Sequence, residues 1–191
     1  SLRIFDAFSG VDLLIFWDSG APSGLGLPVS RCIGDLFALP AQVRPNPLIL
    51  NGYDGSRNQT DAHAVLDSLG IFRQRRAVMN PILLVCGADL FTAGVTSLFG
   101  LSRPRSLVAV VSTARLDNRF YDLPENEEDL VDRLVKESAH EIGHLFMLEH
   151  CDDSRCIMFP PLTLDDLDRK KRWFCPSCQA MLESVTLQAS I

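Results

Sequence analysis

The chain contains short, continuous apolar runs that end in polar or turn-forming residues. They lie at residues 13–17, 81–86 and 107–112. Such a run, without polar alternation, is typical of a strand buried on both faces of a sheet. Prolines interrupt residues 43–50, which favours a strand at a sheet edge, and residues 2–8 predict a short extra strand or an irregular arm.

Apolar residues at helical spacing lie between and after these runs. Residues 28–39 carry an apolar face and end before Pro40, and residues 57–72 repeat the pattern. Near the C-terminus, residues 162–174 and 176–185 are predicted to form shorter helical pieces.

A further helix is predicted to lead into a histidine-rich stretch. Residues 122–125 have capping character, and Glu127, Glu128 and Asp129 would place negative charge at the positive end of the helix dipole. The acidic run is therefore explained by helix stability and not by a binding partner. Gly143 costs about 1 kcal/mol relative to alanine inside a helix, which indicates close backbone packing. The buried stripe consists of Leu130, Leu134, Ala139 and Ile142.

The histidine-rich stretch has the spacing of a metal site. His140 and His144 are four residues apart, so both imidazoles leave one face of a helix and can share a metal ion. Glu141 lies about 100° around the helix from His140, beside the metal, where it can accept a proton from water. A catalytic zinc usually has three protein ligands, and His150 is the expected third. The alternative is a chance pairing of core histidines with a salt-bridging glutamate.

Four cysteines follow at spacings that are also typical of zinc. Cys175 and Cys178 form a Cys-x-x-Cys pair, and Cys151 and Cys156 supply the other half of a tetrahedral thiolate site. A closed site of this kind is structural. Because Cys151 directly follows His150, the site would hold the segment that carries the third histidine. Two disulfides are the alternative, although nothing else in the sequence indicates an oxidising compartment.

Together these motifs resemble the archaemetzincins, a branch of the metzincin zinc metallopeptidases. The specific part is His-Glu-x-x-His through His-Cys at residues 140–151, then Cys-x-Met at 156–158 and Cys-x-x-Cys at 175–178. Weaker similarities extend the resemblance over about residues 11–180. They are Arg57-Asn58-Gln59 opening a helix, residues 88–91, 98–100 and 110–112, and Arg115-Leu116.

The resemblance implies two Zn²⁺ ions per chain. His140, His144 and His150 would hold a catalytic zinc, with Glu141 as general base. Met158 would supply the methionine turn, an apolar floor beneath the metal. The second, structural zinc would be held by Cys151, Cys156, Cys175 and Cys178.

The resemblance also implies the fold. We expect a metzincin-like three-layer α/β/α fold with a mixed, mostly parallel, twisted sheet and an antiparallel edge strand. Residues 1–150 would form the metalloprotease-like domain, and residues 151–191 a small C-terminal helical subdomain stapled by zinc. The edge strand is expected within residues 96–101. There, residues 98–101 would bind an extended peptide by strand addition, unless a helix covers that edge.

One residue departs from the family pattern. Met147 stands where the family has glycine, at the point where the helix must stop and turn back toward the metal. Glycine enters positive φ freely, whereas a side chain there costs on the order of 1–2 kcal/mol. Either Met147 accepts this strain or the turn has another shape. We keep His150 as a ligand, because zinc binding can offset a penalty of this size.

The expected function is zinc-dependent hydrolysis of peptide bonds. The alternative from another class is a zinc-bound regulatory or peptide-binding module with weak or lost catalytic activity, because Met147 could misplace His150. A third hypothesis is a hydrolase that acts on esters or other amides. A peptide or protein is therefore the expected partner, acted on by a monomer.

The composition excludes several other classes. A formal charge of -6 and a pI of about 5.1 argue against nucleic acid or an anionic membrane as the main partner. The basic run at residues 169–172 lies among aspartates and is interpreted as a solvated helix face. No apolar run approaches the roughly 20 residues that span a bilayer. Asp6 and Asp12 interrupt the opening residues, so no signal peptide is expected.

Cysteine usage predicts a reducing, cytoplasmic location. Four of the six cysteines have metal-binding spacing. The other two, Cys32 and Cys86, lie in apolar segments and are predicted to be small buried residues.

Overall fold

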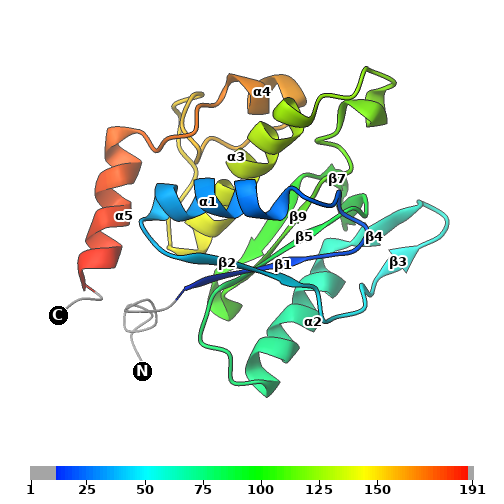
Figure 1. Cartoon of the computed structure of the whole chain (residues 1–191), viewed down its shortest axis with the longest axis horizontal. Helices are drawn as coiled ribbons and strands as arrows, with labels where there is room; N and C mark the ends of the chain where they lie inside the picture. The colour runs from blue at the N-terminus through cyan, green and yellow to red at the C-terminus, as the bar shows by residue number, and fades with distance from the viewer. Residues whose placement is uncertain (1–11, 189–191) are drawn as a thin grey trace.

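A five-stranded sheet forms the centre of the computed structural model, which describes residues 12–188 (Figure 1). Its strand order is β2-β1-β5-β9-β8. Four strands are parallel, and β8 pairs antiparallel with β9 at one edge. This confirms the predicted sheet and its antiparallel edge, whereas the predicted segment 2–8 lies outside the described residues. The strands are β1 (Leu13–Trp17), β2 (Ala41–Pro45), β5 (Ile82–Cys86), β8 (Gly100–Arg103) and β9 (Val108–Ser112).

Helices cover both faces of this sheet. The helices α1 (Gly26–Phe37) and α3 (Glu127–Leu145) lie on one face, and α2 (Ala62–Arg75) lies on the other (Figure 1). Alternate residues of each strand point to opposite faces. Accordingly, Ile15 belongs to the buried cluster of α1 and α3, and its neighbour Phe16 to that of α2. The predicted three-layer α/β/α fold is confirmed.

A second, four-stranded sheet has the order β3-β4-β6-β7. Its first two strands form a ribbon that projects from the body of the protein (Figure 1). The predicted edge segment 96–101 is therefore divided, because β7 belongs to this sheet and β8 to the central one. The strands are β3 (Tyr53–Asp54), β4 (Gln59–Asp61), β6 (Leu90–Thr92) and β7 (Val95–Leu98).

The prediction that Arg57 opens a helix is wrong. The strand β4 follows it, and α2 begins only at Ala62, where the Asp61 side chain accepts a hydrogen bond from the N–H of His63. Gln59 explains the difference, because its side-chain amide donates to Asp89 and to the carbonyl of residue 96. These partners are distant in sequence, so helical spacing could not reveal them.

The cap of α3 also differs from the prediction. Asn126, and not residues 122–125, is the N-cap, and its side chain accepts a hydrogen bond from the N–H of Asp129 at 3.1 Å. The acidic first turn is present as predicted. Pro124 disfavours a helical conformation at Leu123, and Asn126 has a side chain that can cap the helix, whereas Pro124 has none. The helix therefore begins at Glu127, just after the predicted capping segment, and runs unbroken through His140 and His144.

The C-terminal part contains two helices, α4 (Leu164–Arg169) and α5 (Pro176–Gln188). The first is shorter than the predicted 162–174. The predicted solvated helix face at residues 169–172 is only partly right, because three of the four residues are exposed but α4 ends at Arg169 and Lys170 is buried. Lys170 is fully buried, and its Nζ donates to the carbonyl of Phe159 at 2.8 Å. A buried ammonium needs compensating charge, which α3 supplies through buried Glu137 and Glu141.

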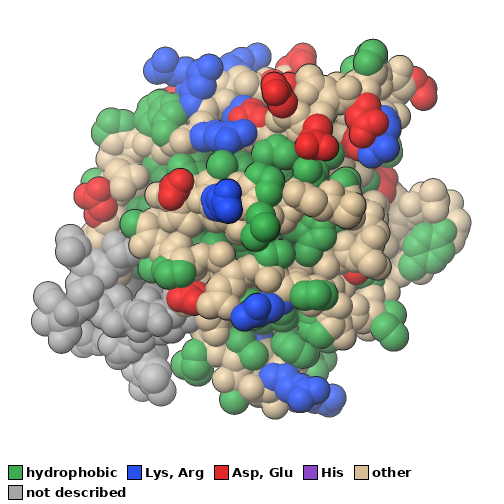
Figure 2. Space-filling model, in the orientation of Figure 1, with side chains coloured by type: hydrophobic (Ala, Val, Ile, Leu, Met, Phe, Trp, Pro, Cys, Tyr) green, Lys and Arg blue, Asp and Glu red, His purple; other side chains and the backbone are tan. Residues whose placement is uncertain are grey.

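The mixed charge of the surface agrees with the composition, and one of the two remaining cysteines is buried as predicted. On the face shown in Figure 2, acidic and basic side chains are interspersed over a largely neutral surface. Cys86 is fully buried, whereas Cys32 is half-buried. Within residues 12–188, no helix combines the length and apolar character needed to cross a bilayer.

Candidate metal centres and catalytic site

Three histidines converge at the C-terminal end of α3. His140 and His144 lie one turn apart, and the chain then turns back and brings His150 to them. Their potential ligand atoms all lie within 4.8 Å of one another, and the Nε2 atoms of His140 and His144 are 3.2 Å apart. With Zn–N distances of about 2.0–2.1 Å, a tetrahedral site needs nitrogens about 3.3 Å apart. The trio therefore fits a zinc ion.

Backbone carbonyls orient the two helical imidazoles. Nδ1 of His140 is 2.8 Å from the carbonyl oxygen of Ile157, and Nδ1 of His144 is 2.8 Å from that of Leu148. A protonated Nδ1 that donates to a carbonyl leaves Nε2 as the metal ligand. Burial lowers the pKa of His140 to about 2 and also lowers the pKa of His144. Both rings are thus neutral, as metal ligation requires.

The turn after α3 shows how Met147 is accommodated. Its φ is +67°, in the left-handed region that glycine tolerates best. The N–H of Met147 donates to the carbonyl of His144, and the N–H of Leu148 donates to that of Gly143, each at 3.0 Å. These bonds satisfy carbonyls at the helix end. Of the two predicted outcomes, Met147 accepts the strain, and His150 still reaches the other histidines.

Glu141 is buried between α3 and the edge strand β8. Its carboxyl group lies beside Ser102 of β8 and beside Glu137, one helical turn earlier, and both influence its pKa. Burial raises its pKa well above the ordinary value, and the charge of Glu137 adds to the effect. Sequence reasoning missed both neighbours. The four-residue spacing could have identified Glu137, but no local signal points to Ser102, because only the sheet brings β8 to α3.

Lys170 is a third neighbour that the sequence did not reveal. Burial lowers its pKa to about 8, although the carboxyl groups of Glu137 and Glu141 oppose this shift. The C-terminal segment therefore contributes a buried positive charge near the base of the candidate site.

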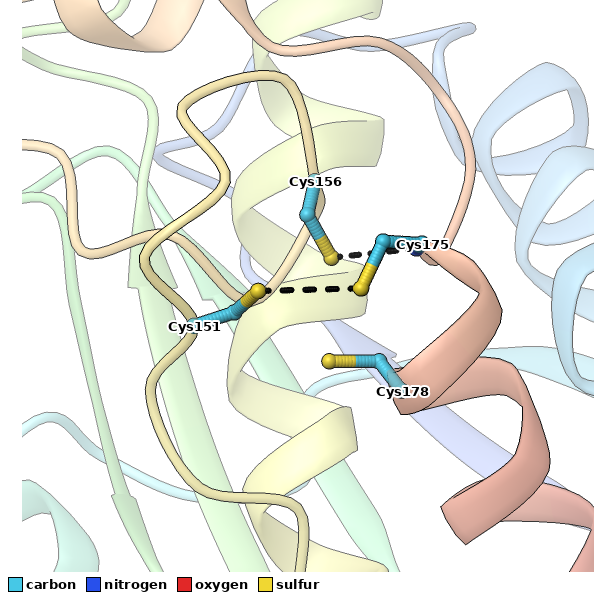
Figure 3. A group of neighbouring side chains, drawn as sticks. All are labelled: Cys151, Cys156, Cys175 and Cys178. Carbon is cyan, nitrogen blue, oxygen red and sulfur yellow. Dashed lines mark hydrogen bonds between the residues drawn. The ribbon is translucent and has the colours of Figure 1, made fainter.

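The four cysteines converge as the spacing predicts. Their sulfur atoms face a common centre between the 151–156 loop and the start of α5 (Figure 3). Sγ of Cys151 and Sγ of Cys175 are 3.7 Å apart, and all four cysteines are free thiols. This is far longer than the roughly 2.05 Å of a disulfide. It matches the separation of about 3.8 Å expected for sulfurs in a tetrahedral site with Zn–S of about 2.3 Å.

Backbone N–H groups contact two of these sulfurs, and one further backbone hydrogen bond links Cys151 to Met158. Cys156 Sγ accepts N–H groups of Met158 and Cys175 at 3.5 and 3.3 Å, and Cys151 Sγ accepts that of Asp153 at 3.4 Å. The N–H of Cys151 also donates to the carbonyl of Met158 at 3.0 Å. A backbone hydrogen bond between Cys151 and Met158 thus closes the loop that follows His150.

Two cavities flank the histidines. The larger, of about 620 Å³, is walled by Leu101, Pro104, Met147 and Leu148 together with the histidine cluster. The smaller, of about 220 Å³, lies between residues 95–99 and residues 160–162. Both share Gly100, His140, Glu141 and His150. Two of the candidate ligands and the candidate base therefore line both cavities, beside the first residue of β8.

Comparison with known proteins gives a consistent picture. The family model of peptidase family M54 matches residues 38–184. An archaemetzincin of Thermococcus kodakarensis is 36% identical over 135 residues, which are 71% of this chain and 72% of the relative. Another, from Pyrobaculum aerophilum, is 38% identical over 132 residues, 69% of this chain and 76% of the relative.

Solved structures agree with the sequence comparison. The crystal structure of a zinc-dependent peptidase from Methanocorpusculum labreanum superposes with a TM-score of 0.85 at 40% identity, covering 89% of this chain and 99% of that one. That of an archaemetzincin from Methanopyrus kandleri gives a TM-score of 0.74 at 28% identity, covering 91% and 95%. The chain therefore belongs to peptidase family M54, the archaemetzincins, and is a zinc-dependent metallopeptidase.

Proposed function

We propose that His140, His144 and His150 hold the catalytic zinc and that Glu141 is the general base of peptide-bond hydrolysis. The convergence of the three imidazoles beside a buried glutamate is the observation that carries this proposal. The grouping of the three rings fits zinc, and so do the hydrogen bonds that Nδ1 of His140 and Nδ1 of His144 make to backbone carbonyls. When bound, zinc would polarise the scissile carbonyl and lower the pKa of a water molecule at the site.

Glu141 moves the proton in this reaction. It accepts a proton from the attacking water and delivers it to the nitrogen of the leaving amine. The raised pKa of its carboxyl group brings its proton affinity closer to that needed near neutral pH. Ser102 and Glu137 hold the carboxyl group in place. No serine or cysteine nucleophile is required.

The substrate in this proposal is a peptide that lies along β8. This strand ends the central sheet, so its outer edge is available for strand addition. Both cavities open beside Gly100 of β8, next to the histidines. The edge is thus narrowed from the predicted residues 98–101 to the strand that begins at Gly100.

We also propose that Cys151, Cys156, Cys175 and Cys178 hold a second, structural zinc. In this arrangement, residues 151–191 form a C-terminal subdomain on the domain of residues 1–150. The second metal would hold the loop that follows His150 and contains Met158, the residue of the methionine turn. Two zinc ions per chain follow from these two sets of ligands.

The test compares the zinc-loaded protein with Glu141→Gln on a mixed peptide pool, with products identified by mass spectrometry. Glu128→Gln is the matched control, because Glu128 is exposed at the opposite end of the same helix. We expect cleavage by the wild type and the control, and a loss of roughly a hundredfold or more in the Glu141 variant. Equal background rates in all three would instead favour the regulatory or peptide-binding module.

A further inference from the structure

Met147 combines a strained backbone with a side chain that belongs to neither buried hydrophobic cluster. Its φ of +67° lies in the left-handed region, yet its side chain is 46% exposed. A buried side chain could offset the strain by core packing, but an exposed one gains little. Glycine at this position would remove the strain at once. Folding stability therefore does not account for methionine here.

The position of the side chain indicates its use. Met147 lines the larger cavity, of about 620 Å³, in which Leu101, Pro104 and Leu148 provide the other apolar walls. The same cavity reaches His140 and Glu141. Residues with a strained backbone persist only where the surrounding structure holds them, and they cluster at active sites and ligand-binding segments. Methionine is also flexible and polarizable, so it adapts to apolar and aromatic partners.

The two cavities would receive different parts of a bound peptide. The smaller cavity, of about 220 Å³, continues from the histidines on the other side. A peptide whose scissile bond lies at the histidines would therefore place one flanking side chain in the cavity of Met147 and the other in the smaller one. Only the first cavity contains Met147.

We propose that Met147 determines substrate specificity by selecting a large apolar side chain, such as leucine or phenylalanine, at one residue beside the scissile bond. This inference rests on the proposed function, because it takes the histidine cluster as the place of cleavage. The strain at φ +67° is then retained for a contact with substrate.

The experiment separates the side chain from the strain. Met147→Gly and Met147→Asn both relieve the left-handed strain and remove the apolar wall, whereas Met147→Leu keeps both. Ala77→Gly is the matched control, because Ala77 has φ +51° in the loop after α2, outside both cavities. Each variant is made in the zinc-loaded protein, alone and combined with Glu141→Gln, which blocks turnover but leaves the cleft.

Two readouts are needed. Melting temperature should rise by about 2–4 °C in the glycine and asparagine variants and in Ala77→Gly, and should stay unchanged in Met147→Leu. Selectivity is the ratio of kcat/KM, and of affinity in the Glu141→Gln background, between peptides with leucine or phenylalanine and peptides with serine at each flanking position. We expect this ratio to fall roughly tenfold in Met147→Gly and Met147→Asn, and to persist in Met147→Leu and Ala77→Gly.

The outcomes distinguish this inference from the proposed function. If peptides are cleaved but selectivity is the same in Met147→Gly, the inference is overturned and the peptidase assignment stands. If nothing is cleaved but apolar peptides still bind the Glu141→Gln protein in a Met147-dependent way, the proposed function fails and the role of Met147 in recognition is supported. If selectivity and stability change together in every variant, including Ala77→Gly, Met147 is structural and the inference is wrong.

Discussion

Gly143 of α3 and Met158 lie in such close contact that no side chain fits between them. A methyl group added at Gly143 would lie 2.5 Å from Sδ of Met158 and 3.2 Å from its Cε. Met158 is fully buried. The close packing predicted from a glycine inside a helix is thus present. Its partner is Met158 of the proposed methionine turn, and Gly143 directly precedes His144.

This contact predicts the effect of Gly143→Ala. Alanine favours a helix by about 1 kcal/mol over glycine, but overpacking a buried site costs about 1–3 kcal/mol. Because Met158 is fully buried, its side chain can move away only by repacking its neighbours, so we expect net destabilisation of about 1 kcal/mol in urea unfolding. Gly70→Ala in α2 is the control, because its added methyl would meet only Ser106, at 3.7 Å. That variant should be stabilised, and stabilisation of both would contradict the packing argument.

A second glycine, Gly100, leaves the space that the side chain of Glu141 occupies. A methyl group at Gly100 would lie 2.9 Å from Cγ of Glu141 and 2.9 Å from the carbonyl oxygen of Val110. Because the backbone of β9 is fixed, Gly100→Ala should displace Glu141. We expect kcat to fall about ten- to a hundredfold while zinc content is unchanged. Gly55→Ala, with only Tyr53 near at 3.7 Å, is the control. Unchanged kcat in Gly100→Ala would argue against Glu141 as the base.

The cysteine cluster predicts a change in metal content. Cys156→Ser should reduce zinc from two ions per chain to one or none, because serine replaces a thiolate ligand. Activity should fall as well, because the loop after His150 loses its attachment. Plasma emission analysis of dialysed protein measures the zinc, and Cys32→Ser outside the cluster is the control. Two zinc ions retained in Cys156→Ser would refute the structural site.

Buried Lys170 predicts a pH dependence of stability. Its pKa is lowered by burial to about 8, against an ordinary value of 10.5. Between these values the unfolded chain binds more protons than the folded one, so stability rises with pH. Relative to Lys170→Met, the zinc-loaded wild type should gain on the order of 3 kcal/mol from pH 8 to 10.5.

Urea unfolding at pH 7.5, 9 and 10.5 measures this gain. Lys171→Met also removes one positive charge, but from an exposed side chain, and serves as the control. A constant difference between wild type and Lys170→Met across this range would contradict the burial of a charged lysine.

The sequence alone determined the features that depend on local spacing. A four-residue interval on a helix places His140 and His144 on one face, and continuous apolar runs produce the buried strands β1, β5 and β9. The Cys-x-x-Cys spacing likewise brings Cys175 and Cys178 together at the start of α5. Each of these follows from the geometry of a single element, so no tertiary information was needed.

Tertiary structure decided what depends on contacts between distant elements. Long-range hydrogen bonds of Gln59 turn an expected helix start into strand β4, and Ser102 meets Glu141 only because β8 lies beside α3. Lys170, predicted to be solvated, is buried because the C-terminal segment folds back beneath carboxyl groups of α3. The turn at Met147 also needed the structure, since the hydrogen bonds around it, and not its own conformational preference, hold it in the left-handed region.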